Sequence, residues 1–378
     1  MMGIFKIALK LLINDRAKFA ALIVGITFAI FLIVQLTSIF AGILSKASAN
    51  VINIGARIWV MDPSVNNPLN TIPMPDYVLD AVRSIKGVKY AVPLYSSVGL
   101  VRLRSGAYQP ATVIGLDDAT LLGRPELTEG RIEDLYGENA FVVVKDQEYA
   151  KLEKPSIGTT FEINDHRGLI VGIARVTTSG LFGIPTLYTT YNRAIQYLPN
   201  TRFTIAHVLV EPKSDADIEE IKNEIAKIGY LGLTDREFQE KTADFYIFKT
   251  GAGVNILMMT LIGFLVGLSI SGQTFYTFIL ENLDKFGALK AIGAKNSELV
   301  FMILCQASFA CFVGYGMGVG LSSLLIFLGK RYVPSYTADI GYWNLALAFL
   351  MVLVIAGVSS LLAVKKVIKV QPFEILRG

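Results

Sequence analysis

Four long stretches of the chain contain no Asp, Glu, Lys or Arg, and they dominate its hydrophobic pattern. These stretches are 25 to 31 residues long and comprise Phe19–Ser45, Thr250–Leu280, Leu299–Gly329 and Ile340–Val364. A helix needs about 20 apolar residues to cross a bilayer, where it must satisfy its own backbone hydrogen bonds. Each stretch is long enough, so the pattern predicts four transmembrane helices.

The polar segments between these stretches complete the predicted organisation. We expect a cytoplasmic amphipathic helix at 1–18, transmembrane helices at 19–46, 250–280, 299–329 and 340–364, an extracytoplasmic domain at 47–249, a cytoplasmic helix at 281–298, an outer loop at 330–339 and a cytoplasmic tail at 365–378. In the first segment Ala8, Leu11 and Leu12 follow helical spacing, which predicts a helix lying on the inner leaflet or supporting a neighbouring subunit.

The 203-residue insert at 47–249 has a different pattern, with short alternating runs separated by turn residues. Strands are predicted at Ile58–Met61, Ala91–Val101, Pro110–Gly115, Ala140–Val144, Thr160–Ile163, Leu169–Ile173 and His207–Glu211. Helices are predicted from Pro75 to Ile85 and from Ser214 to Ile228, the second with Ser214 as its N-cap. This order predicts an α+β domain in which a β-rich lobe covers about 126–200.

The charge distribution predicts how the chain is oriented. The chain is 53% hydrophobic and 17% charged, against about 25% charged residues in a typical soluble domain,. The insert holds 21 basic and 25 acidic residues, so the net charge of +4 comes from the segments beside the apolar stretches. Basic residues beside transmembrane helices favour the cytoplasm, which places both termini inside and the insert outside. Lys330 and Arg331 are a mild exception, and nothing in this distribution indicates nucleic-acid binding.

No combination of residues in the sequence indicates catalysis. The two histidines, His166 and His207, are far apart in the chain, and neither belongs to a cluster with metal-ligand spacing,. Cys305 and Cys311 are both in the third apolar stretch, six residues apart on a helix, and cannot form a disulfide with each other. The nucleotide-binding pattern GxxxxGK[ST] and the hydrolase patterns GxSxG and HExxH do not occur. We therefore expect no catalytic, cofactor or metal site here, and ATP, if used, to be bound by a partner.

Two apolar stretches contain closely spaced glycines. Gly263 and Gly267 are four residues apart in the second stretch, and Gly314 and Gly318 are four apart in the third. This spacing lets helix backbones approach closely in lipid. We expect these four glycines to serve helix packing.

The charged segment at 281–298 predicts a short separate helix. Phe286, Leu289 and Ile292 recur every three residues, with Asp284, Lys285 and Lys290 elsewhere around the helix. Gly293 is placed to end this helix and Asn296 to cap the next one. Such a helix suits docking into a groove on a cytoplasmic partner, although a helix lying on the membrane surface has the same pattern.

Two motifs carry a resemblance to a known family. Residues 287–294 read Gly-Ala-Leu-Lys-Ala-Ile-Gly-Ala, similar to the G-x-L-K-A-x-G-A coupling-helix motif, and the tail Val370–Arg377 is similar to D-P-x-E-x-L-R with Gln371 in place of Asp. With the layout of one helix, a large external domain and three helices, the chain resembles the ABC transporter permeases that include MacB, FtsX and LolC/LolE. Within that family it is most similar to DevC-type exporter permeases.

The resemblance implies a homodimer in the cell inner membrane with a MacB-like periplasmic core. An ABC ATPase subunit would dock on the coupling helix, through Asp284, Lys285, Phe286, Gly287, Leu289, Lys290, Ile292 and Gly293. The ATPase would drive export by mechanotransmission, together with a periplasmic adaptor protein and an outer-membrane channel. The alternatives are an FtsX-like signal transducer that activates an external hydrolase and a LolC/LolE-like lipoprotein-releasing permease.

Overall fold

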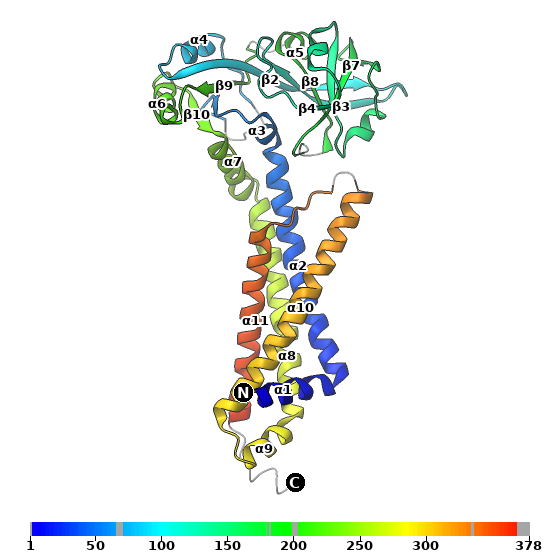
Figure 1. Cartoon of the computed structure of the whole chain (residues 1–378), viewed down its shortest axis with the longest axis vertical. Helices are drawn as coiled ribbons and strands as arrows, with labels where there is room; N and C mark the ends of the chain where they lie inside the picture. Colours follow the sequence, from blue (N-terminus) through cyan, green and yellow to red (C-terminus); the bar gives the residue numbers. More distant parts are fainter. Residues whose placement is uncertain are drawn as a thin grey trace. The chain divides into compact units, whose positions relative to one another are not determined.

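The structure, a computed structural model, describes residues 2–65, 71–178, 180, 183–198, 203–333 and 336–368. The chain divides into two compact units, one helical and one built on a sheet (Figure 1). The helical unit consists of Met1–Gly42, Gly253–Tyr332 and Thr337–Gly378, and the sheet unit consists of Ile43–Ala252 and Val333–Tyr336.

The helical unit contains the four predicted membrane helices. Its elements are α1 (Met2–Asn14), α2 (Arg16–Ala47), α8 (Ala252–Glu281), α9 (Leu283–Ala291), α10 (Asn296–Tyr332) and α11 (Tyr342–Ile368). Of these, α2, α8, α10 and α11 are long and apolar enough to cross a membrane. This confirms the predicted fold class of four transmembrane helices with an inserted α+β domain.

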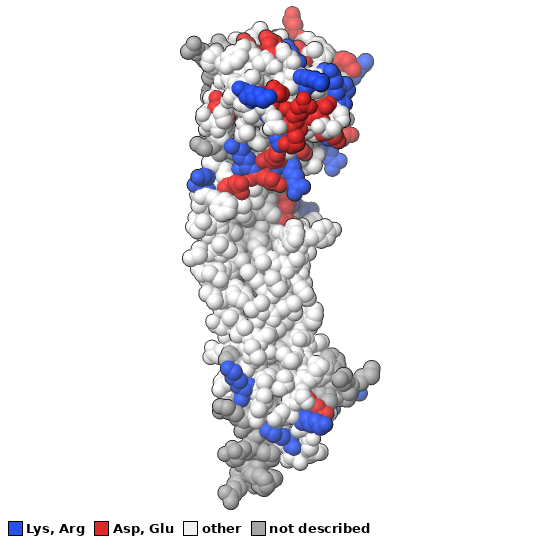
Figure 2. Space-filling view, turned by 90° about the vertical axis from the view of Figure 1, so that its left-hand side faces the viewer, with Lys and Arg blue, Asp and Glu red and all other residues white. Residues whose placement is uncertain are grey.

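The four long helices share one apolar core and expose apolar side chains outward. Ile26, Ile30, Phe275 and Ile303 are buried in the core. Leu257 on α8 is 65% exposed. On the face shown in Figure 2, a wide surface of these helices carries no charged side chain. An exposed apolar surface of this kind is suited to lipid rather than water.

The short helix α1 is part of this unit's packing. Ala8 and Leu12 are fully buried, while Lys6 and Lys10 are exposed. The Gln306 side-chain amide on α10 donates a hydrogen bond to the Ala8 carbonyl over 2.9 Å. The apolar face of α1 therefore packs against α10, so the helix does more than rest on the membrane surface.

The sheet unit is built on one mixed sheet. Its strands are β1 (Ile58–Met61), β2 (Val88–Arg102), β3 (Tyr108–Leu116), β4 (Glu126–Gly130), β5 (Ala140–Val144), β6 (Thr160–Ile163), β7 (His166–Arg175), β8 (Thr186–Thr190), β9 (His207–Pro212) and β10 (Leu231–Thr234). The strand order is β10-β1-β9-β2-β3-β8-β5-β7-β4, and β6 pairs with β2 and β7.

The long strand β2 joins two lobes of this sheet. Its first half, from Val88 to Leu94, pairs with β9 in the mixed lobe, which also contains β1 and β10. Its second half, from Tyr95 to Arg102, pairs with β3 in the β-rich lobe, which also contains β4 to β8. The β-rich lobe therefore begins well before residue 126. The predicted boundary at about 126 lies later than the observed pairing because a single strand serves both lobes.

Helices cover both faces of the mixed lobe. They are α3 (Ala49–Ile54), α4 (Tyr77–Arg83), α6 (Ile218–Lys227) and α7 (Asp235–Asp244), and α5 (Tyr191–Tyr197) lies in the β-rich lobe. Alternate residues of a strand face opposite sides of a sheet. Accordingly Ile58 packs in the core that includes α4 and α6, and Trp59 in the core that includes α3 and α7.

Short helices complete the sheet unit, namely η1 (Ile132–Tyr136), η2 (Tyr149–Leu152), η4 (Asp215–Asp217) and the π-helix η5 (Phe245–Lys249). Ser214 caps η4 through a capping box with Asp217, which explains why this helical segment starts where the sequence predicted,. Thr234 and Glu237 form the same motif at α7. The helix α7 was not predicted, although its Thr-x-x-Glu capping pattern is present in the sequence.

Candidate coupling site

The candidate site is α9, the short helix that connects α8 to α10. Asn282 lies between α8 and α9, and its side-chain amide donates to the Phe278 carbonyl over 2.8 Å. At the other end Gly293 has a φ of 105°, which favours glycine,. The Gly293 N–H donates to the Lys290 carbonyl over 3.1 Å, and the Ala294 N–H donates to the Leu289 carbonyl over 3.0 Å. This is a Schellman motif, so Gly293 ends the helix as its position in the sequence predicted.

The next helix begins differently from the prediction. Asn296 is the first residue of α10 and not a cap outside it. The Lys295 N–H donates to the Glu298 carboxylate over 2.9 Å. Glu298 therefore satisfies a backbone donor at this helix start, a role in which an acidic side chain is favourable.

The three residues of the predicted apolar stripe differ in burial: two pack against the core of the helical unit and one is exposed. Phe286 is 1% exposed and belongs to the core of the helical unit, and Gly287 is also buried. Leu289 is half-buried and packs against the same core. Ile292 is 85% exposed. Phe286, Gly287 and Leu289, which were expected to face a partner, instead attach α9 to its own chain.

The exposed side of α9 presents mixed chemistry. Asp284 and Lys285 are exposed, and Lys290 is half-buried. The Lys285 ammonium donates to the Asn282 side chain over 2.7 Å, and the Lys290 ammonium donates to the Ile368 carbonyl at the end of α11 over 3.1 Å. Lys290 thus links α9 to α11. Ile292, in contrast, is a large apolar side chain that remains exposed.

An ion-pair group ties α8 to the junction of α1 and α2. The Lys18 ammonium pairs with Asp15 at 2.9 Å and also with Glu281, the last residue of α8. The hydrogen bond from Lys18 lowers the pKa of Asp15 below its usual value,. The sequence suggests the local pair of Asp15 and Lys18, but the contact with Glu281 joins distant segments and no local pattern indicates it.

The four glycines predicted to serve helix packing all lie against α2. A Cβ added at Gly267 would meet the Ala29 Cβ at 2.2 Å, and one at Gly314 would meet the Ile26 side chain at 2.5 Å. A Cβ at Gly318 would meet the Ile30 side chain at 2.8 Å, whereas Gly263 has ordinary contact with Leu32 at 3.4 Å. Gly267, Gly314 and Gly318 therefore allow an approach to α2 that a larger residue blocks.

The remaining sequence candidates fall outside this site. The tail motif Val370–Arg377 lies outside the described residues. Both histidines are in the sheet unit, where His166 stacks on Tyr197 and His207 is buried at the start of β9. Within the described ranges, no group of three or more His, Cys, Asp or Glu side chains is placed to hold a metal ion.

Two known domain families match different parts of the chain. Residues 19–228 match the MacB-like periplasmic core domain, and residues 256–372 match the FtsX-like permease C-terminal domain. The chain belongs to the MacB/FtsX-type family of ABC transporter permeases. With its four apolar helices, this membership makes the chain a membrane protein with an extracytoplasmic domain, which is the sheet unit.

Several relatives of this permease are known by sequence. It is 25% identical over 185 residues to an uncharacterized ABC transporter permease of Methanocaldococcus jannaschii, covering 45% of each chain. It is 26% identical over 125 residues to the putative hemin transport system permease HrtB of Staphylococcus haemolyticus, covering 33% of this chain and 34% of HrtB. It is 22% identical over 364 residues to the macrolide export ATP-binding/permease protein MacB of Neisseria meningitidis, covering 89% of this chain and 54% of MacB. The chain spans about a third to about half of the length of these relatives.

Two solved structures of external domains align with part of the permease. The periplasmic region of MacB from Actinobacillus actinomycetemcomitans aligns with 50% of this chain and 93% of its own, at 12% identity and a TM-score of 0.39. The extracellular domain of the ABC-type transporter YknZ from Gram-positive bacteria aligns with 47% of this chain and 99% of its own, at 14% identity and a TM-score of 0.37.

Proposed function

We infer that this permease is the membrane subunit of an ABC export system whose ATPase is a separate chain. The observation that carries the proposal is the division of α9 into a buried side and an exposed side. Phe286 attaches the helix to the permease core, and Ile292 projects from it with Asp284 and Lys285 also exposed. A helix held in this way can bind a partner and pass on its displacement. ATP would be bound by the ATPase, and the permease itself would need no cofactor and catalyse no reaction.

The contacts around α9 supply a route for motion through the helical unit. The helix is continuous in the chain with α8 and α10, and Lys290 connects it to the end of α11. Glu281 and Lys18 connect the end of α8 to the start of α2. A displacement of α9 would therefore reach all four long helices, which is what mechanotransmission requires.

The chain passes from α2 into the sheet unit and returns from it to α8. One residue, Ser48, separates α2 from α3, and the π-helix η5 leads from α7 towards α8. Both α3 and α7 pack in the core that contains Trp59. We propose that movement of the transmembrane helices reaches the external domain through α3 and α7, and that this movement drives export.

The proposed assembly follows the family resemblance. Two copies of the permease would form a homodimer in the inner membrane with both termini in the cytoplasm, which agrees with the basic residues Lys6, Lys10, Arg16 and Lys18 near the N-terminus. The external domain would meet a periplasmic adaptor protein that leads to an outer-membrane channel. The size of the insert favours this export role over signal transduction, because the external domains of FtsX-type signal transducers are usually smaller than this insert.

Replacement of Ile292 tests the docking role of α9. Ile292→Asp places a charge on the exposed side without removing a core contact, so the ATPase should co-purify at a level at least about tenfold lower, equivalent to 1.4 kcal/mol. Ser297→Asp is the control, because it introduces the same charge at an exposed position outside α9. Leu289→Asp should instead lower the stability of the permease itself, because Leu289 packs in its core.

The measurement is the amount of ATPase retained per permease in membranes that contain both chains. Normal retention by Ile292→Asp would contradict docking at α9. Equal loss in Ile292→Asp and Ser297→Asp would also contradict it, because the effect would then follow charge in general and not the site.

A further inference from the structure

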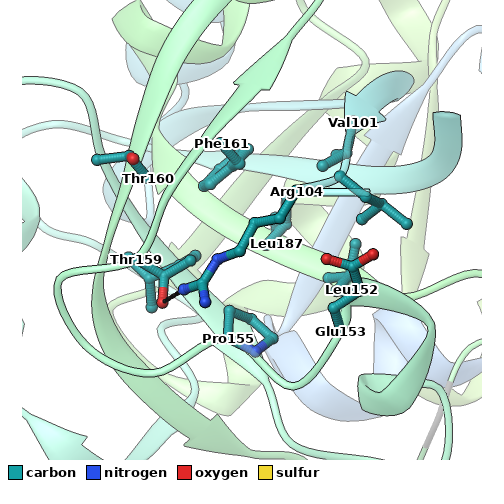
Figure 3. A pocket seen from close by; sticks show the side chains of 11 residues that line it. Val101, Arg104, Leu152, Glu153, Pro155, Thr159, Thr160, Phe161 and Leu187 are labelled. Carbon is teal, nitrogen blue, oxygen red and sulfur yellow. Dashed lines mark hydrogen bonds between the residues drawn. The ribbon is translucent and has the colours of Figure 1, made fainter. Parts of the chain in front are cut away.

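The β-rich lobe of the sheet unit contains an apolar pocket that the coupling role does not explain (Figure 3). It lies among the ends of β2, β6, β7 and β8 and the loop at 152–159. Its apolar lining consists of Val101, Leu103, Leu152, Pro155, Phe161, Ile170 and Leu187. The pocket leaves about 30 Å³ open. Since a water molecule needs about 10–15 Å³, the pocket itself has room for about one methyl group, and the rest of a short alkyl group would extend into the neighbouring hollow.

The shape of this pocket depends on Phe161 and Gly168. The ring of Phe161 packs edge-to-face on Phe141 at a centroid distance of 5.4 Å. A Cβ at Gly168, the residue paired with Phe161 across the β6–β7 ladder, would meet the Phe161 ring at 2.4 Å. The absence of a side chain at Gly168 thus leaves room for the Phe161 ring. Contact with Gly168 and Phe141 holds this ring as part of the apolar wall of the pocket.

A positive charge is held at the rim of the pocket. The Arg104 guanidinium donates to the Thr159 hydroxyl oxygen over 2.7 Å. Thr159 is buried, and its hydroxyl oxygen also accepts from the Ser156 N–H over 3.0 Å. Figure 3 shows the guanidinium directed to Thr159, on the other side of the pocket from the Glu153 carboxylate. Arg104 is therefore oriented by a neutral partner, and its charge is available to a ligand.

A second, more open hollow of about 490 Å³ adjoins the pocket. The two share Leu103, Arg104, Thr160 and Phe161. The open hollow adds Arg102, Glu162 and Arg167, of which Arg102 and Glu162 pair with each other at 3.0 Å. Across the described part of the chain, no carboxylate lies within 4.0 Å of the Arg104 or Arg167 guanidinium. Glu162 also stands opposite Arg167 in the β6–β7 ladder. The lining of the open hollow thus carries three guanidinium groups against one carboxylate, and the hollow is large enough for a small ligand,.

We propose that this double pocket binds an anionic amphiphile, with a short apolar group in the pocket and a carboxylate or phosphate held by Arg104 and Arg167. Guanidinium groups bind both anions through paired hydrogen bonds, and the apolar wall adds selectivity for a ligand with a hydrocarbon group beside its charge. Binding at this site requires neither ATPase nor transport, so its test is independent of the export role.

The test measures binding of four soluble probes to the full chain in nanodiscs of zwitterionic lipid by ligand-observed NMR. Isovalerate and isopentyl phosphate combine an anion with a branched alkyl group, isopentanol lacks the charge, and inorganic phosphate lacks the alkyl group. Isovalerate or isopentyl phosphate should bind about tenfold more tightly than both isopentanol and inorganic phosphate. The affinities of isovalerate and isopentyl phosphate then show whether the site prefers a carboxylate or a phosphate. Equal affinity for isopentanol and both combined probes would overturn the proposal.

Variants separate the two halves of the site. Arg104→Gln with Arg167→Gln should abolish the preference for the anion and leave isopentanol binding unchanged. The control is Arg131→Gln, an exposed arginine of the same lobe that lines neither hollow. Gly168→Ala should displace Phe161 and weaken all probes that carry the alkyl group. An unchanged preference in the double arginine variant, or the same loss in Arg131→Gln, would overturn the proposal even if Gly168→Ala does not fold.

Discussion

The helical unit and the sheet unit both bury large aromatic side chains, but the helical unit adds contacts between helices that only glycine allows. In the helical unit, Gly267, Gly314 and Gly318 remove side chains where α8 and α10 meet α2. In the sheet unit, Trp59, Phe141 and Tyr188 fill the cores with large side chains between strands. Apolar side chains are as favourable in lipid as in a protein core, so no hydrophobic force drives helices together in a membrane. Helix association there depends more on van der Waals contact, which close approach of the backbones increases. In water, burial of a large apolar side chain is favourable in proportion to the apolar area that it removes from solvent. The sheet unit is therefore stabilised by its large buried side chains.

Substitution of the packing glycines should have the largest effect. Gly318→Leu places a large side chain against Ile30 and the Thr27 carbonyl, and overpacking of this kind costs about 1–3 kcal/mol or more,. The matched control is Gly320→Leu on the same helix, where a Cβ meets nothing within 4 Å. Thermal unfolding in detergent should show a clear loss for Gly318→Leu and little change for Gly320→Leu. Equal losses would show that helix propensity, and not close approach to α2, explains the glycines.

An effect of similar size that depends on pH is expected from the one buried histidine described in the sheet unit. Burial lowers the pKa of His207 to about 4 from the ordinary value of 6.5. The unfolded chain therefore takes up a proton near pH 6.5, whereas the folded chain resists protonation until about pH 4. The sheet unit should lose stability as the pH falls from 6.5 to 4, by about 3 kcal/mol in total from this residue.

His207→Phe should reduce that pH dependence. Neither ring nitrogen of His207 has a hydrogen-bond partner among the described residues, and the ring packs against Trp59 at a centroid distance of 5.3 Å. An apolar ring of similar size therefore loses no hydrogen bond. Hydrogen exchange of β1 and β9 in the full chain, measured at pH 7 and pH 4.5, should show a smaller change in the variant. An unchanged difference between the two pH values would assign the effect to carboxylates instead.

The two units also differ in how far their sequences predict them. The transmembrane helices were predicted because charges are excluded from lipid, so the absence of Asp, Glu, Lys and Arg marks them directly. The strands β1, β5 and β6 were predicted at their observed bounds. The shared strand β2 was predicted as Ala91–Val101, inside its observed bounds of Val88–Arg102. Its pairing in both lobes, and hence the early start of the β-rich lobe, was not predicted, since strand pairing joins residues distant in sequence and local patterns do not specify it.

The same limit applies within the candidate site. The end of α9 at Gly293 was predictable because a Schellman motif depends on a few adjacent residues. The burial of Phe286 was not, because a three-residue apolar spacing fits a helix face turned to its own chain as well as one turned to a partner. The ion pair between Lys18 and Glu281 likewise depends on the fold of the helical unit.

The most direct test of the central claim is a photo-crosslink from position 292. A photoreactive amino acid placed there in the full chain, in membranes of cells that make the complete system, samples what touches the exposed side of α9. The account predicts a crosslink to an ATP-binding cassette subunit, and none from the same probe at Val254, an exposed position in α8. Crosslinks from position 292 to lipid alone would show that α9 lies on the membrane and does not couple this permease to an ATPase.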